Sequence, residues 1–307
     1  MFIRDRNGHR GGGDRRAEKE RRFRSDERSC ERTGEEMRQG ELLLKQMREN
    51  HPRVHCIANL AAGPDVANIL LAAGARPILA QAKEEAGEIA AACAAAVLNF
   101  GTPDEEKLKG ILAAGLGAKA AGVPVTADPV GAGASSWRKE QTLRLLDSIR
   151  PDVIHCNFSE ALALLGETGE FHGVDSAGAG LRERAACARR TAVKYGCVVL
   201  LSGEEDVVSD GLRERVVRGG TPAMGLVTGT GCMLSALTGA FLGGQRPEER
   251  DYFEGVAAAA SFWKACGELA WEETKKAGGG AGTFRVRLFD AAGSIEEWRE
   301  NIEDFTG

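Results

Sequence analysis

A glycine-rich segment at residues 227–234 contains the residue types best suited to chemistry. It reads Val-Thr-Gly-Thr-Gly-Cys-Met-Leu, and an apolar helix is expected to begin at Cys232. Two glycines let the backbone fold tightly, so that unpaired N–H groups gather at the positive end of the helix dipole. Such a point stabilises phosphate oxygens and the charge that develops in phosphoryl transfer. An ordinary glycine turn before a helix is the structural alternative.

Two other segments carry acidic side chains where expected strands end. Asp128 opens the segment Asp-Pro-Val-Gly-Ala-Gly-Ala, and Glu160 follows Asn157 at the start of an expected helix. Mg²⁺ prefers one or two carboxylates and several waters, so both residues are candidate metal ligands. Either side chain would equally serve as a cap of a turn or helix, and the spacing leaves this open. The sequence contains no GxxxxGK[ST] and no clean GxGxxG, which excludes the P-loop and the dinucleotide fingerprint.

Apolar runs that alternate with longer segments of helical spacing must position these residues. The expected buried strands are residues 54–58, 77–80, 95–99, 123–127, 153–156 and 198–202. The helices expected between them are residues 65–73, 83–92, 104–121, 138–149 and 181–195. This alternation predicts an α/β fold with a mainly parallel sheet and helices on both faces. Ligands of such sheets bind beyond the carboxyl ends of the strands, where Asn59, Asp128 and Asn157 lie.

The ends of the chain are expected to differ in character. Residues 1–40 are rich in Arg, Glu and Gly and are predicted to be a flexible, charged extension, with a helix at about 35–49 leading into a single domain over 41–307. Near the C-terminus we expect an edge hairpin, two Ala-rich helices, a weak strand and a final helix. These elements cover residues 206–210 with 213–218, 232–242, 250–269, 284–288 and 295–304.

Composition excludes several classes of protein. The chain has 307 residues and a formal net charge of −5, so the acidic body offers no electrostatic footprint for nucleic acid. The longest uncharged run, 219–245, contains eight glycines and would form a poor membrane helix. The eight cysteines include no CxxC, and the N-terminus lacks the apolar stretch of a secretory signal. We therefore expect a reduced, cytoplasmic protein that acts on small molecules, with no nucleic-acid or membrane partner.

The motifs together resemble the hydroxyethylthiazole kinase family, which belongs to the ribokinase-like superfamily. They run from about residue 51 to 290 in the family's order and include His55-Cys-Ile-Ala-Asn59, Leu98-Asn-Phe-Gly-Thr102 and the three segments described above. The resemblance implies a ribokinase-like three-layer α/β/α fold. It also implies Mg²⁺-dependent transfer of phosphate from ATP to the primary alcohol of 4-methyl-5-(2-hydroxyethyl)thiazole, a step of thiamine salvage. A homotrimer with substrate pockets between subunits is implied as well.

The resemblance further assigns roles to single residues. Cys232 is expected to orient or weakly deprotonate the substrate hydroxyl, because a helix N-terminus lowers thiol pKa values. The backbone of Gly229, Thr230 and Gly231 is expected to stabilise the transition state. The implied substrate-binding residues are Leu79, Gly229 and Asn59, the implied ATP-binding residues are His155, Ser202 and Asn157, and the implied metal ligands are Glu160 and Asp128.

Some positions depart from the family's pattern. His155 stands where the family has Arg, which exchanges a permanent forked cation for an imidazole that is mostly neutral at pH 7. Gly63-Pro64-Asp65 replaces a Thr-Met-Asn-like segment, and Pro64 removes a backbone donor. These changes motivate two alternatives to the thiazole alcohol kinase. One is a ribokinase-like kinase of another small heterocyclic or sugar-like alcohol, and the other is a non-catalytic relative that binds its ligand without turnover.

Overall fold

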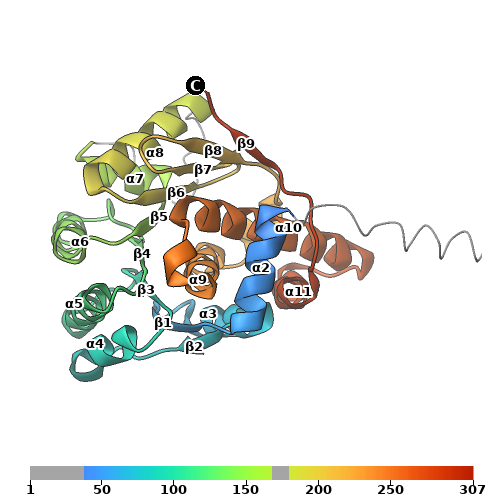
Figure 1. Cartoon of the computed structure of the whole chain (residues 1–307). Helices are drawn as coiled ribbons and strands as arrows, with labels where there is room; N and C mark the ends of the chain where they lie inside the picture. Colours follow the sequence, from blue (N-terminus) through green and yellow to red (C-terminus); the bar gives the residue numbers. More distant parts are fainter. Residues whose placement is uncertain (1–37, 168–179, 307) are drawn as a thin grey trace, which may run out of the picture. The chain divides into compact units, whose positions relative to one another are not determined.

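A nine-stranded sheet runs through the part of the chain that the computed structural model describes, residues 38–167 and 180–306 (Figure 1). The strand order is β2-β1-β3-β4-β5-β6-β7-β8-β9. The first six strands pair in parallel and are β1 (Arg53–Ile57), β2 (Arg76–Ile78), β3 (Ala95–Asn99), β4 (Val125–Asp128), β5 (Val153–Asn157) and β6 (Val198–Ser202). The last three, which pair antiparallel, are β7 (Asp206–Ser209), β8 (Glu214–Val217) and β9 (Ile302–Asp304).

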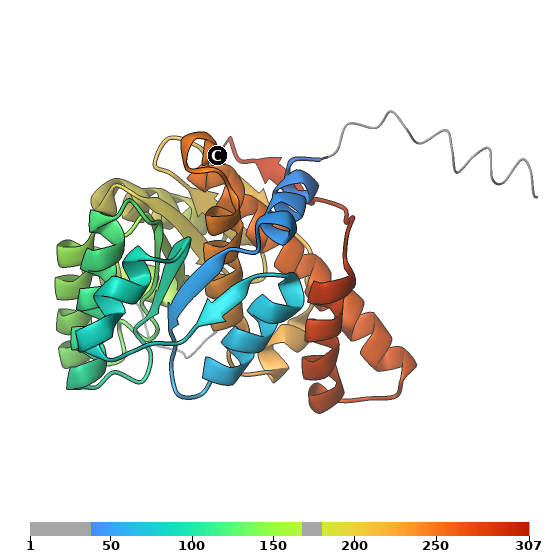
Figure 2. The same cartoon turned by 60° about the horizontal axis from the view of Figure 1, so that its bottom comes forward.

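Helices cover both faces of this sheet, as Figure 2 shows. One face packs against α4 (Lys83–Ala91), α5 (Glu105–Ala120), α6 (Ser136–Ile149), α7 (Phe158–Leu165) and α8 (Leu181–Tyr195). The other face packs against α2 (Gln39–Asn50), α3 (Gly63–Ala73), α9 (Thr230–Gly244), α10 (Tyr252–Lys276) and α11 (Ala281–Ser294). Side chains along β3 alternate between the two cores, because successive residues of a strand face opposite sides. The predicted three-layer α/β/α fold is confirmed.

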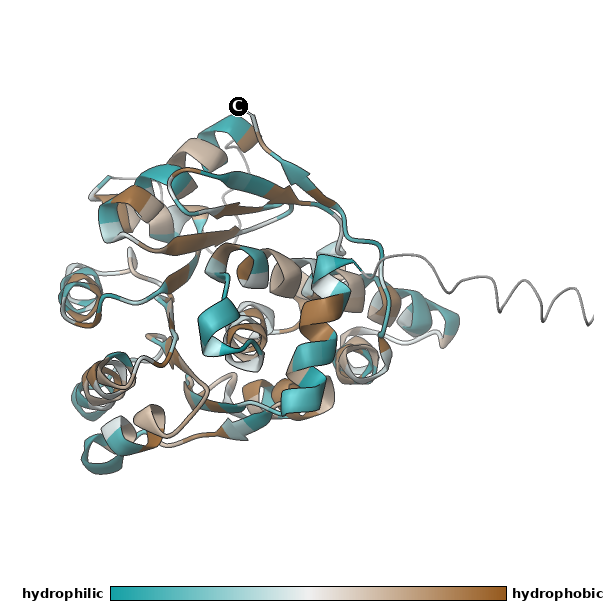
Figure 3. Ribbon diagram, viewed as in Figure 1, coloured by the Kyte–Doolittle hydropathy of each residue, from teal (hydrophilic) through white to brown (hydrophobic). Residues whose placement is uncertain are grey.

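Helix α9 is the central helix of its layer and sets the position of the glycine-rich segment. It is buried along most of its length and coloured as largely apolar in Figure 3. Gly239 lets it approach the sheet, since a Cβ there would lie 2.4 Å from Val97 Cγ2 on β3. Gly243, near its C-terminus, lies against Ala94 and Ala95 at the start of β3. The helix therefore runs antiparallel to the strands, with its N-terminus at their carboxyl ends.

Most predicted elements match the observed ones. The six expected strands and the five helices between them lie within two residues of their observed bounds, and the edge hairpin forms as β7 and β8. The expected leading helix is α2 where it falls within the described residues, whereas the predicted extension over 1–40 lies almost entirely outside them. In the described part of the chain, no helix combines the length and the apolar character needed to cross a bilayer.

The two predictions for the last segment are wrong. Residues 284–288 belong to helix α11 and not to a strand, because the buried positions Phe284, Leu288, Ala291 and Ala292 follow helical spacing. Val286, which completed the apparent alternation, is 55% exposed. Residues 295–304 form no helix. Ile295 and Trp298 are buried in an irregular segment, and the chain then pairs with β8 as β9.

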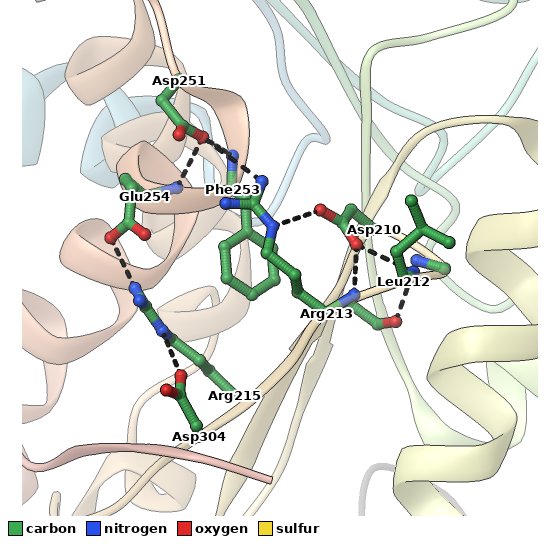
Figure 4. A network of polar contacts seen from close by, with 10 residues as sticks. Asp210, Leu212, Arg213, Arg215, Asp251, Phe253, Glu254 and Asp304 are labelled. Carbon is green, nitrogen blue, oxygen red and sulfur yellow. Dashed lines mark hydrogen bonds and ion pairs between the residues drawn. The ribbon is translucent and has the colours of Figure 1, made fainter. Parts of the chain in front are cut away.

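An ion-pair network fastens the antiparallel edge to α10 (Figure 4). The Arg215 side chain donates to Glu254 of α10 and to Asp304 of β9. Arg213 donates to Asp210, and its guanidinium lies over the ring of Phe253, 4.2 Å from the centroid. A hollow of about 450 Å³ opens beside these residues. It also borders Val198 at the amino end of β6, so it lies away from the carboxyl ends of the strands.

Candidate active site

A cluster of polar side chains forms where β1, β3 and β4 end. Asn59 follows β1, and Asn99 and Asp128 are the paired last residues of β3 and β4. The Asn59 Nδ2 donates to Asn99 Oδ1 at 3.1 Å, and Asn99 Nδ2 donates to Asp128 Oδ2 at 2.7 Å. Three neighbouring parallel strands thus bring together residues that are up to 69 positions apart in the chain.

Cys232 closes this cluster from the first turn of α9. Its Sγ lies 3.2 Å from the Nδ2 atoms of both Asn59 and Asn99. Among the cysteines that the structure describes, it is the one that is not buried. Burial, followed by the charge of Asp128, nevertheless raises the pKa of the Cys232 thiol to about 12. Burial outweighs the lowering expected at a helix N-terminus, so the thiol is protonated at neutral pH and suited to orient a hydroxyl group, not to deprotonate it.

The N-terminus of α9 offers free backbone donors next to this thiol. Gly229 is the N-cap residue and has φ +86°, a left-handed conformation that favours glycine. Met233 N–H donates to the Gly229 carbonyl at 2.8 Å. Within the described chain, the N–H groups of Thr230, Gly231 and Cys232 have no acceptor. These three donors at the positive end of a 15-residue helix form a site suited to a phosphate group.

The three residues predicted to bind substrate lie around the turn between β1 and α3. Asn59 Oδ1 accepts hydrogen bonds from the N–H groups of Ala61 and Ala62 and so holds the turn. A Cβ added to Gly229 would lie 2.9 Å from Ala62 Cβ, and one added to Gly63 would lie 3.9 Å from Leu79 Cδ2. Leu79 is 48% exposed. The turn therefore joins the free amides of α9 to an accessible apolar side chain.

Asp128 has one oxygen held and one free. Its Oδ2 accepts from Asn99 Nδ2 and, at 2.8 Å, from Ser235 Oγ. Its Oδ1 accepts no hydrogen bond from the described residues, so it is the oxygen that is left for a ligand. Burial, followed by the nearby charge of Glu160, raises the pKa of Asp128 to about 7. A cation bound between these two carboxylates would relieve that repulsion.

Glu160 caps α7 and lies near Asp128 at the same time. Its Oε1 accepts from Gly131 N–H at 2.7 Å and its Oε2 accepts from Asn157 N–H at 2.9 Å, while Asn157 Oδ1 accepts from Glu160 N–H. This is the capping box that the sequence left open as an alternative. Burial raises the pKa of Glu160. No trio of His, Cys, Asp or Glu side chains within 38–167 and 180–306 could enclose a metal, but Mg²⁺ coordination by one or two carboxylates, waters and phosphates needs none.

Of the three residues predicted to bind ATP, Asn157 and Ser202 are the last residues of β5 and β6, and His155 is the middle residue of β5. Asn157 and Ser202 are paired across these strands. His155 is buried, its Nδ1 lies 2.6 Å from Ser235 Oγ, and burial lowers its pKa to about 4. The imidazole is therefore neutral, as the departure from Arg suggested. A Cβ added to Gly231 would lie 3.8 Å from His155 Cε1, which places the ring beside the free amides of α9.

Sequence reasoning missed two residues of the site, Lys107 and Ser235. Lys107 is 2% exposed, and its Nζ donates to the Gly101 carbonyl at 2.5 Å. Burial lowers the pKa of Lys107 to about 8, against the opposing effect of the Asp104 and Asp128 carboxylates. Its position could have been found, since it shares helical spacing with Ile111 and other buried residues of α5. Ser235 carries no such signal within the apolar run of α9.

Comparisons with known proteins identify the family and the fold of the chain. The model of the Hydroxyethylthiazole kinase family matches residues 44–297. The chain is 41% identical over 250 residues to a hydroxyethylthiazole kinase of Nitratidesulfovibrio vulgaris (strain DP4), which covers 81% of this chain and 90% of that protein. The structure of the hydroxyethylthiazole kinase protein from Pyrococcus horikoshii OT3 superposes with a TM-score of 0.77 at 34% identity and covers 88% and 100% of the two chains. A ribokinase-like superfamily protein from Enterococcus faecalis V583, with a TM-score of 0.52 at 14% identity over 85% and 99% of the two chains, shares the fold.

Proposed function

Because the chain belongs to the hydroxyethylthiazole kinase family and phosphorylates the thiazole alcohol with ATP, we propose that the reaction takes place at the N-terminus of α9. The observation that carries this proposal is that the N–H groups of Thr230, Gly231 and Cys232 find no acceptor among residues 38–167 and 180–306. These N–H groups lie at the same end of α9 as the Cys232 thiol and the Asp128 carboxylate. A glycine turn with only a structural role would not need these groups beside it. The comparisons offer no support for another acceptor alcohol or for a non-catalytic relative.

Each side of this site has a role in phosphoryl transfer. The amides of Thr230, Gly231 and Cys232 hold the transferred phosphoryl group and stabilise the charge that develops on its oxygens. The substrate hydroxyl lies against Cys232 Sγ, which Asn59 and Asn99 hold in place. Since the thiol is protonated, it orients the hydroxyl. As the hydroxyl oxygen bonds to the γ-phosphorus, ADP leaves, and the hydroxyl proton passes late in a loose transition state to an oxygen of the transferred phosphoryl group.

The remaining residues serve the nucleotide and its cation. Asp128 Oδ1, with Glu160 nearby, fits Mg²⁺, which supplies neutralisation of phosphate charge when it is bound. Asn157 and Ser202 lie at the ends of β5 and β6 and line the approach for ATP. Leu79 and the turn at Asn59 contact the thiazole ring.

A coupled assay of ADP release tests the proposal. With ATP and Mg²⁺, we expect ADP release that depends on 4-methyl-5-(2-hydroxyethyl)thiazole and the appearance of its phosphate ester by mass spectrometry. The Cys232→Ala variant should bind the thiazole alcohol calorimetrically with nearly unchanged affinity and turn over more slowly, because only the orienting contact is lost. Turnover equal to that of the wild type would show that Cys232 takes no part in the reaction. Phosphate transfer to a different alcohol alone would show that the thiazole alcohol is not the substrate.

We also propose that the chain assembles as a homotrimer in the cytoplasm, as the family resemblance implies. The exposed side chains Leu60, Leu79 and Leu226 flank the site and would be covered by a neighbouring subunit. Light scattering coupled to size exclusion should give three times the chain mass of 32.6 kDa. A monomer with full activity would contradict a shared pocket, and cell fractionation tests the location.

A further inference from the structure

A chain of three buried side chains leads from β5 through α9 to Asp128. His155 Nδ1 lies 2.6 Å from Ser235 Oγ, and Ser235 Oγ lies 2.8 Å from Asp128 Oδ2. The exposed fractions of the three residues are 3%, 0% and 4%. Ser235 lies one helical turn after Gly231, so the chain connects the carboxylate to the helix that carries the free amides.

The single hydroxyl proton of Ser235 sets the directions of these hydrogen bonds. Ser235 Oγ has two possible acceptors, Asp128 Oδ2 at 2.8 Å and the Gly231 carbonyl at 3.3 Å. When Asp128 is ionised it only accepts, so the proton points to the nearer and charged Oδ2, and Ser235 uses a lone pair to accept from His155. His155 then carries its proton on Nδ1. Its Nε2 is left as a lone pair, and this atom is buried without a partner in the described part of the molecule. Burial lowers the pKa of His155 to about 4, so the imidazole is neutral and carries one ring proton. Because Nδ1 donates to Ser235, that proton is on Nδ1.

Building on the proposed function, we propose that His155 is a positioning residue that orients Asp128 through Ser235. Asn99 and Ser235 both donate to Asp128 Oδ2, so this oxygen is held from two sides. Asp128 Oδ1 accepts no hydrogen bond from the described residues and is the oxygen available to a cation. A carboxylate fixed at one oxygen presents the other in a single orientation, which reduces the entropy lost on binding.

This role differs from direct contact between His155 and the phosphates of ATP. In the Nδ1–H tautomer, Nε2 accepts hydrogen bonds and cannot donate to a phosphate oxygen, which itself only accepts. The orphaned Nε2 is thus the expected consequence of using Nδ1 for Ser235. Position 155 contributes to the site through an internal hydrogen bond and contributes no charge.

Nitrogen NMR tests the tautomer without reference to activity. The full chain, labelled with ¹⁵N-histidine, contains five histidines, and the His155 signals are identified by their loss in His155→Asn. We expect the Nδ1–H pattern in the wild type at pH 8.5, where Asp128 is ionised. The Ser235→Ala variant should lose this preference. An Nε2–H pattern in the wild type would overturn the proposal.

Kinetics and cation binding test the coupling. We expect His155→Leu and Ser235→Ala each to lower kcat about 10-fold, as the loss of a hydrogen bond to a charged group predicts. Each should weaken Mn²⁺ binding, measured by electron paramagnetic resonance in the absence of substrate, with an unchanged KM for the thiazole alcohol. His155→Asn keeps an N–H donor near the Nδ1 position and should recover most of both effects.

The double variant decides whether His155 acts through Ser235. Combining His155→Leu with Ser235→Ala should lower kcat and Mn²⁺ affinity no further than Ser235→Ala alone. Multiplied losses, or wild-type Mn²⁺ affinity in both folded single variants, would overturn the proposal. If the wild type transfers no phosphate to the thiazole alcohol, the proposed function fails, while the NMR and Mn²⁺ measurements still decide this inference.

Discussion

Replacing Gly229 by alanine tests the central claim that the amides of α9 hold the migrating phosphoryl group. Gly229 has φ +86°, and an alanine forced into this left-handed conformation costs about 1–2 kcal/mol. Its Cβ would also lie 2.9 Å from Ala62 Cβ, a contact that requires the turn at Ala62 or the start of α9 to move. Overpacking of this kind costs about 1–3 kcal/mol. The first turn of α9 carries the free donors, so their displacement should lower kcat.

The expected loss in kcat is about 100-fold or more, the size found when one donor of an oxyanion-type site is removed. Gly196 provides a matched control. It also has a left-handed backbone, at φ +61°, but no atom lies within 4 Å of its added Cβ. Gly196→Ala should therefore lower the free energy of unfolding by about 1–2 kcal/mol and leave kcat unchanged.

A second variant separates the contact from the backbone strain. Adding Ala62→Gly to Gly229→Ala removes the atom 2.9 Å away, and the next atom, Ala62 Cα, lies at an ordinary 3.5 Å. Steady-state kinetics by coupled ADP release, together with thermal melting, should show that the double variant recovers most of kcat without recovering all of the stability. Wild-type kcat in Gly229→Ala would refute the reasoning, because the amides could then move without consequence.

Three further predictions concern the charges and the thiol of the site. Lys107→Met should move the acidic limb of the pH–rate profile to higher pH, because the Lys107 charge lowers the pKa of Asp128; Lys109→Met, on the exposed side of α5, should not. Asp128→Asn should abolish detectable turnover yet raise the melting temperature of the ligand-free protein at pH 8. At this pH the wild-type Asp128, whose pKa is about 7, is ionised although it is buried, and the neutral amide avoids that cost. Equal melting temperatures of the two proteins at pH 8 would contradict the raised pKa. Since the pKa of the Cys232 thiol is raised to about 12, iodoacetamide at pH 7.5 should alkylate Cys232 much more slowly than a free cysteine peptide. Mass spectrometry of the peptide that contains Cys232 measures this rate, and alkylation as fast as that of the free peptide would contradict the raised pKa.

Asp128 shows why such a site is costly to maintain without its ligands. A carboxyl whose pKa is raised in the folded state contributes stability at low pH, and that contribution is lost as the pH rises through the folded pKa. At neutral pH the protein holds a buried carboxylate against the charge of Glu160. Ligands that neutralise this charge should stabilise the fold, which links binding to stability.

The spacing of apolar residues was sufficient to predict those elements in which it fits either a strand or a helix but not both. The strand β3, expected and observed over residues 95–99, is buried at every position, and α8 was predicted at its observed bounds. The segment 284–288 failed because its apolar residues satisfy both periods over five positions. Only packing against α3 and α10, with Val286 turned outward, decides for the helix.

The amino-acid sequence by itself determined the alternation of strands and helices, the glycines before Cys232 and the family to which these motifs belong. These depend on nearest neighbours in the chain and on the residue types that a turn or helix start allows. Tertiary structure alone decided that the Cys232 thiol keeps its proton and that His155 bonds Ser235. The physical reason is that burial and hydrogen-bond partners come from segments distant in the chain, which no local pattern encodes.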